Sequence, residues 1–152
     1  MEKIKLITDT SCDIPKDQAN RMDIQMLPIP ITIGDKGYME GEDFTTDEFY
    51  QILLDSPELP CTSHIPAPVF TQAFQQAAQE GYNRIICVTI NSKGSNMFQA
   101  ATMARSFFFE EFPQWKDSVR IEVIDSKAYT MGYGMPLLMA ASMVEEGASF
   151  EA

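Results

Sequence analysis

Short apolar segments alternate with longer amphipathic ones along the whole chain. The apolar segments predict three strands, at residues 3–9, 84–90 and 119–125. Residues 24–33 are also extended, but Pro28 and Pro30 restrict them to an edge or irregular strand. The amphipathic segments predict five helices, at residues 14–21, 45–54, 69–80, 95–112 and 131–146. This order predicts an α/β fold with a mostly parallel sheet covered by helices on both faces, and no linker divides residues 1–152.

Four polar loops lie between the predicted strands and helices. Ligands of such folds bind beyond the carboxyl ends of the strands, so these loops are the candidates for a site. Their sequences are TDTSCD (8–13), TSHIPAP (62–68), NSKGSN (91–96) and DSKAYTMGYG (125–134).

The charge of the chain narrows the classes of partner. The net charge is −11 and the pI is about 4.4. Binding to nucleic acid or to an anionic membrane needs clustered Lys and Arg, so neither partner is expected. There is no run of eighteen apolar residues and no signal peptide in the first residues, which predicts a cytoplasmic protein without a membrane span. The three widely spaced cysteines are expected to be reduced.

The NSKGSN loop follows the clearest strand and opens a helix. Ser92, Ser95 and Asn96 would lie where free backbone N–H groups and the helix dipole favour an anion. Gly94 would let a ligand approach the backbone. Simple capping would explain one of these polar residues but not three, so the loop predicts a site for a carboxylate or another oxyanion.

The TSHIPAP loop carries a hydroxyl pair beside two prolines. The prolines restrict the loop, so Thr62 and Ser63 would lose less entropy when they bind a ligand. His64 is the only histidine, and no nucleophile motif accompanies it, so a surface residue is the simpler interpretation than a catalytic one. Cys61 and His64 could form half of a zinc site, but no second ligand pair has a suitable spacing.

The TDTSCD loop allows two interpretations. Thr10, Ser11 and Asp13 either cap the next helix or face a ligand. The loop contains no glycine, which excludes a dinucleotide-binding turn, and it lacks the aspartate pattern of the common metal-dependent phosphatases.

Two sets of large apolar residues recur in the helices. Met131, Met135, Met139 and Met143 are four apart, which indicates core packing or, alternatively, the lining of a site for a flexible apolar ligand. Phe107–Phe109 and Phe112 would surround their helix too broadly for one core face, so part of this aromatic surface is expected to meet a partner or ligand.

Five segments together resemble the DegV family, in the same order and over essentially the whole chain. They are TDTSCDIP, LPIPITIGDKGYMEGEDFTTDEFYQ, TSHIPAPVF, NSKGSNMFQAA and VIDSKAYTMGYG. Two positions depart from the family pattern. Asn96 stands where many members have glycine, and His64 replaces a glutamine, with one extra residue before the proline.

The resemblance implies a protein that binds a long-chain fatty acid and presents its carboxylate to a separate fatty-acid kinase, which serves phospholipid synthesis. It implies that Thr62 and Ser95 hold the carboxylate, with Asn96, Ser11, Ser63 and Ser92 close by. It implies no cofactor, no metal and no catalytic residue in this chain.

The resemblance covers only the amino-terminal half of a typical member. A carboxy-terminal domain that covers the lipid is therefore expected to be absent from this chain, and an uncovered half-tunnel would favour a homodimer. Two alternatives use the same loops: a protein-interaction module that binds no lipid, and an enzyme that acts on a small molecule through Asp9, Ser11 or His64.

Overall fold

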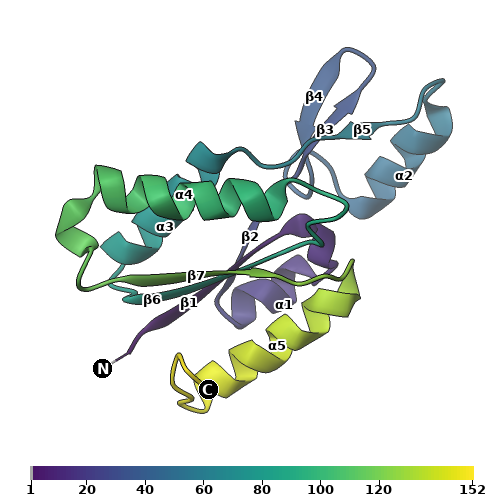
Figure 1. Cartoon of the computed structure of the whole chain (residues 1–152). Helices are drawn as coiled ribbons and strands as arrows, with labels where there is room; N and C mark the ends of the chain where they lie inside the picture. The colour runs from purple at the N-terminus through teal and green to yellow at the C-terminus, as the bar shows by residue number, and fades with distance from the viewer. Residues whose placement is uncertain (1) are drawn as a thin grey trace.

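A four-stranded parallel sheet forms the centre of the protein (Figure 1). The computed structural model describes residues 2–152. The strand order is β2-β1-β6-β7, with bounds Ile24–Leu27, Ile4–Asp9, Arg84–Thr89 and Arg120–Asp125. Because all neighbouring strands are parallel, their carboxyl ends lie at one edge. The predicted α/β class and mostly parallel sheet are confirmed.

Helices cover both faces of this sheet, and Figure 1 shows α3 and α4 on one side and α1 and α5 on the other. Their bounds are Ala67–Gln79 for α3, Met97–Glu111 for α4, Lys16–Arg21 for α1 and Met131–Glu145 for α5. Side chains of strand β1 pack into the hydrophobic cores on both faces of the sheet. Ile7 packs in the core under α3 and α4, whereas Ile4 and Leu6 pack in the core under α1 and α5. This alternation follows from the two-residue repeat of a strand.

A smaller antiparallel unit projects from the sheet (Figure 1). Its strand order is β4-β3-β5, with bounds Lys36–Met39, Pro30–Ile33 and Cys61–Thr62. Helix α2, Thr46–Asp55, belongs to the same unit and begins with a capping box in which Thr45 and Glu48 satisfy each other's backbone N–H groups. No residue of α2 is buried, and Phe49 of α2 stacks on Phe44 with ring centroids 5.2 Å apart. The helix is therefore attached mainly through aromatic contacts.

The structure corrects three details expected from the sequence. The extended segment 24–33 divides at Pro28 into β2 and β3, which belong to different sheets, and β4 and β5 were not predicted. Helix α1 begins after Pro15 without a side-chain cap, so Thr10, Ser11 and Asp13 do not cap it. Two 3-10 turns, Thr10–Cys12 and Pro113–Trp115, were also not predicted.

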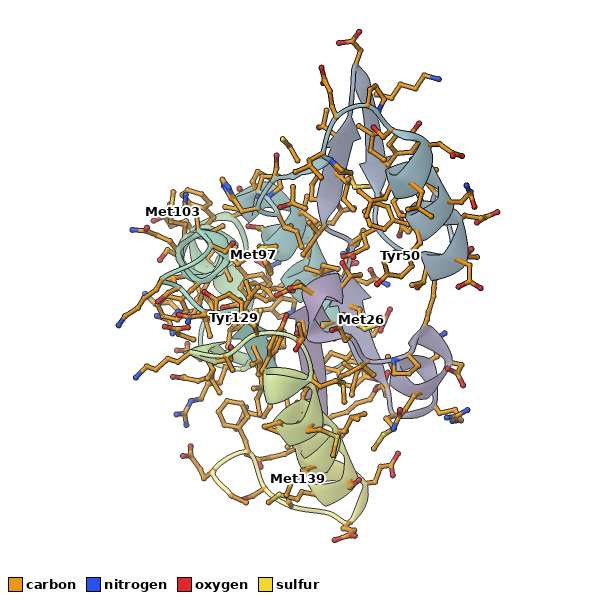
Figure 2. The ribbon with its side chains drawn as sticks, turned by 90° about the vertical axis from the view of Figure 1, so that its right-hand side faces the viewer. Met26, Tyr50, Met97, Met103, Tyr129 and Met139 are labelled. Carbon is orange, nitrogen blue, oxygen red and sulfur yellow. The ribbon has the colours of Figure 1, made fainter. Side chains whose placement is uncertain are left out.

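Of the four methionines of α5, Met131 packs against the core and the other three do not. Met135, Met139 and Met143 are 51%, 63% and 44% exposed, while Leu137, Leu138 and Ala141 fill the core beneath the helix. Figure 2 shows Met139 on the outer side of α5. The prediction of a methionine-lined core was therefore wrong for these three positions.

The phenylalanines of α4 are mostly internal. Phe108 is fully buried and stacks on Trp115, with ring centroids 5.4 Å apart, and Phe109 and Phe112 pack against the same cluster. Only Phe107 of the four is exposed, at 36%. Trp115, in the turn after the helix, supplies the extra apolar surface that sequence periodicity could not reveal.

Candidate functional site

The segment after β5 lies against the start of α4. The backbone N–H of Ile65 donates to Sδ of Met97 at 3.2 Å, and both residues are almost completely buried. Figure 2 labels Met97 at the beginning of this helix. Thr62 precedes this contact by three residues and pairs with Ile31 of β3. The packing of Ile65 therefore joins the TSHIPAP segment to the helix that the NSKGSN loop opens.

Ser95 is fixed in place but keeps its hydroxyl proton. Its Oγ accepts the backbone N–H of Met97 at 3.3 Å, and it donates to no group among residues 2–152. Asn96 is the residue that precedes α4, and its side chain makes no capping hydrogen bond. The loop thus presents one free hydroxyl donor, one free amide and the N-terminus of a fifteen-residue helix.

Thr62 and Ser63 are also free to donate. Both are exposed, and neither hydroxyl has a hydrogen-bond partner within the described part of the chain. The backbone holds them in place, because the N–H of Ser63 donates to the carbonyl of Pro30 at 3.0 Å. His64 is exposed as well, and its ring forms no hydrogen bond or ion pair with another side chain of residues 2–152. The geometry therefore offers donors for an anion and no relay for catalysis.

The hydroxyl of Ser92 is already used. It donates to Asp125 at 2.6 Å, and the backbone N–H of Ser92 donates to the other oxygen of this carboxylate at 3.0 Å. The Ser92 hydroxyl holds the pKa of Asp125 below its usual value. Since a serine has one proton to give, Ser92 cannot donate to a ligand while this bond exists. Its place in the structure is to join two loops at the sheet edge.

The hydroxyl of Ser11 is used in the same way by a different carboxylate. Asp9 is completely buried, and its Oδ1 accepts the Ser11 hydroxyl, the Ser11 backbone N–H at 3.1 Å and the Tyr133 hydroxyl at 2.7 Å. Its Oδ2 accepts the N–H of Ile90 at 3.2 Å. Burial, and then the charge of Asp9, raise the pKa of Tyr133. Asp9 thus fixes the carboxyl end of β1, the end of β6 and the start of α5.

Tyr129 occupies the space beside Gly94. A Cβ atom added to Gly94 would collide with the hydroxyl and the ring of Tyr129. The sequence suggested that Gly94 leaves room for a ligand, but in the structure it leaves room for this tyrosine. Figure 2 labels Tyr129, whose side chain is half exposed. The sequence placed Tyr129 in a candidate loop without a role, and it named Asp9 only as a possible catalytic residue of an enzyme, whereas in the structure Asp9 is a buried hydrogen-bond acceptor.

The three cysteines differ in accessibility, and Cys61 lies directly before Thr62. Cys61 is exposed, whereas Cys12 and Cys87 are buried. Burial raises the pKa of the Cys12 thiol to about 11 and also raises that of Cys87. An aromatic disulfide reagent at pH 8 is therefore expected to label one thiol in the folded chain and three after denaturation. The variant Cys61→Ser should abolish the rapid labelling, and rapid labelling of two thiols would contradict this structure.

The comparisons with known proteins identify the family. Residues 3–152 match the family described as "uncharacterised protein, DegV family". The chain belongs to the DegV family. A DegV domain-containing protein of Caldanaerobacter subterraneus is 36% identical to it over 151 residues, which are 99% of this chain and 50% of that protein. The chain thus spans about half the length of the DegV relatives it matches.

Solved structures of fatty-acid-binding proteins share the fold. A stearic acid-binding protein from Eubacterium ventriosum is 31% identical with a TM-score of 0.86, and covers 99% of this chain with 50% of its own. A fatty-acid-binding DegV protein from Thermus thermophilus is 29% identical with a TM-score of 0.81, and covers 98% of this chain with 50% of its own. DegV of Bacillus subtilis, a fatty-acid-binding protein, is 25% identical with a TM-score of 0.86, over 98% of this chain and 50% of its own.

Two further findings concern classes of site. Among residues 2–152, no group of three or more His, Cys, Asp or Glu side chains is arranged to hold a metal ion. No helix in the same range has both the length and the apolar character needed to cross a bilayer.

Proposed function

We propose that this chain holds the carboxylate of a long-chain fatty acid through Thr62 and Ser95. The observation that carries this proposal is the distribution of hydroxyl protons. The hydroxyls of Ser11 and Ser92 already donate hydrogen bonds to carboxylates. The hydroxyls of Thr62 and Ser95 donate to no group of residues 2–152, and they lie on two segments joined through Ile65 and Met97. The fatty acids bound by the similar E. ventriosum and T. thermophilus proteins support the ligand class.

Neutral donors suit a ligand that must be both held and released. A hydrogen bond to a charged group contributes about 1.5–3 kcal/mol, and each buried methylene contributes about 0.8 kcal/mol. A long tail therefore supplies most of the affinity, and the two hydroxyls set the orientation of the head group. Backbone N–H groups at the start of α4, next to Asn96, would add the favourable end of the helix dipole.

The same arrangement suits transfer of the ligand to a kinase. Lys93 is the one lysine of the NSKGSN and TSHIPAP segments, and neither segment contains an arginine that could neutralise the carboxylate. A carboxylate oxygen held only by hydroxyl and amide donors keeps its charge and remains able to attack a phosphoryl group. We therefore propose that the chain presents the fatty acid to a cytoplasmic fatty-acid kinase, and that binding, not catalysis, is its own role.

The tail needs a cover that this chain does not supply at the site. Thr62, Ser63 and Asn96 are exposed. The half of the DegV relatives that lies outside this match is the natural candidate for that cover. On this proposal, residues 1–152 supply the head-group site and a second domain, or a second copy of the chain, encloses the tail.

The experiment is a titration of the chain with palmitate that carries ¹³C at the carboxyl carbon. We expect the carboxyl resonance to shift and broaden on binding, and the amide resonances of Ser95 and Thr62 to shift with it. A second measurement uses a fusion of this chain with the carboxy-terminal half of a relative. Mass spectrometry of the lipid extracted from the purified fusion should find fatty acids. An unchanged carboxyl resonance, together with protein that yields no fatty acid, would overturn the proposal.

A further inference from the structure

A cavity of about 580 Å³ lies beside α1 and α2. It opens between α1 and the small antiparallel unit, and neither Thr62 nor Ser95 lines it. Figure 2 shows Tyr50, from α2, above Met26, from β2, and both residues line this cavity. Its volume falls within the range of about 300–1,000 Å³ that is typical of small-molecule sites.

The walls of this cavity are apolar and aromatic. Ile14 and Met26 form the wall on the side of the parallel sheet, and Phe44, Phe49 and Tyr50 form the wall on the side of α2. Phe44 and Phe49 are stacked on each other, which fixes the aromatic wall. Tyr50 remains 59% exposed, so an occupant could still cover a large part of this side chain.

The polar rim of the cavity is strongly negative. Asp13, Glu40 and Glu42 line it, and none of them forms an ion pair within residues 2–152. Lys16 is the only basic residue of the lining, and its Nζ donates to the carbonyl of Gly41 at 3.0 Å. The lining therefore carries a net charge of −2, from three carboxylates and one ammonium group.

We propose that this cavity is a second binding site, and that it takes a small organic cation, an ammonium group carried on an apolar chain or ring. Aromatic faces and carboxylates without a cationic partner are the two groups that attract such a cation. Of the three carboxylates, Glu40 accepts a hydrogen bond from the Thr10 hydroxyl, which leaves its charge in place. The rim would repel a fatty-acid carboxylate, so this site is separate from the one proposed above. A bare metal ion does not fit, because the described carboxylates do not converge on one point.

The test compares two probes with the same apolar chain and opposite charges, decyltrimethylammonium and decanoate, each below its micelle concentration. Amide resonances of the ¹⁵N-labelled chain report where each probe binds. We expect decyltrimethylammonium to shift the resonances of Ile14, Met26 and Tyr50 in a saturable way, and decanoate to leave them unchanged. Equal shifts at these residues with both probes, or no saturation with decyltrimethylammonium, would overturn the proposal.

Matched substitutions separate this site from the general negative charge of the protein. Glu42→Gln removes a charge from the rim, and Glu58→Gln removes one from an exposed residue outside the cavity. We expect Glu42→Gln to weaken decyltrimethylammonium binding about two- to fivefold, as for a partly exposed charge pair, and Glu58→Gln to have no effect. Tyr50→Ser should weaken binding more than Leu54→Ser, which lies on the same helix but outside the lining. Equal effects within either pair would overturn the proposal, and none of these outcomes depends on palmitate binding.

Discussion

The variant Asp9→Asn is expected to lose about 2–4 kcal/mol of unfolding free energy. Asp9 is completely buried and accepts four hydrogen bonds, from Ser11 twice, from Tyr133 and from Ile90. An asparagine of the same shape must place its NH₂ group against one set of these donors. A buried donor without an acceptor costs about 1–3 kcal/mol, and at least two donors lose their acceptor: the NH₂ group of the asparagine and the group that it faces. Denaturant-induced unfolding of the two proteins measures the difference.

The matched control for this variant is Asp13→Asn. Asp13 is exposed, and it has a left-handed backbone with φ of 58°, which asparagine also adopts readily. We expect this variant to remain within about 0.5 kcal/mol of the parent. Amide exchange adds a local measurement, because Asp9→Asn should lower the protection of Ile90 and of the first turns of α5. An unfolding free energy equal to that of the parent would show that the hydrogen bonds of Asp9 do not stabilise the ends of β1 and β6 and the start of α5.

The parallel sheet could be predicted because its signals are local. Residues 84–89 and 120–125 are short apolar runs bounded by polar loops, and helices of thirteen to fifteen residues separate or follow them. The small antiparallel unit gave no such signal. Its strands have two to four residues, and one begins at Pro30, so its pairing depends on contacts between distant segments.

The methionines of α5 show how periodicity can mislead. A repeat of four places Met135, Met139 and Met143 on one face, and pattern alone cannot tell whether that face points inward. In the structure Leu137, Leu138 and Ala141 supply the inward face, because they lie between the methionines along the helix. The helix is apolar nearly all round, so no polar stripe was present to identify its outer side.

The candidate loops could be chosen from the sequence, but the state of each hydroxyl could not. Ser92 and Ser95 are three residues apart and chemically identical. Their difference comes from Asp125, which lies 33 residues beyond Ser92. Ser11 is likewise distinguished from Thr62 by Asp9 and by Tyr133, whose hydroxyl comes from a residue 122 positions further along. Such partners meet only at the edge of the folded sheet. The sequence alone therefore could not separate the six polar residues expected at the site, which are Ser11, Thr62, Ser63, Ser92, Ser95 and Asn96.

The difference between these two serines provides the sharpest test of the head-group proposal. Ser95→Ala removes a free hydroxyl donor, and we expect it to weaken carboxylate binding by about 1.5–3 kcal/mol, or roughly 10- to 150-fold. Ser92→Ala removes a hydroxyl that already donates its hydrogen bond to Asp125, so we expect a much smaller effect on binding. Isothermal titration with palmitate, on protein joined to the carboxy-terminal half of a relative, measures both.

Thr62 allows the same comparison on the other segment. Thr62→Val keeps the shape of the side chain and removes its donor, and we expect a loss of the same size as for Ser95→Ala. Because both hydroxyls would hold one carboxylate, the double variant should lose less than the sum of the two single losses. Acyl-phosphate formation by a fatty-acid kinase should fall further than affinity, since a tail without an oriented head group still binds but does not react. If Ser92→Ala weakened binding as much as Ser95→Ala, or if both donors could be removed without loss, the carboxylate would have to lie elsewhere on the sheet edge.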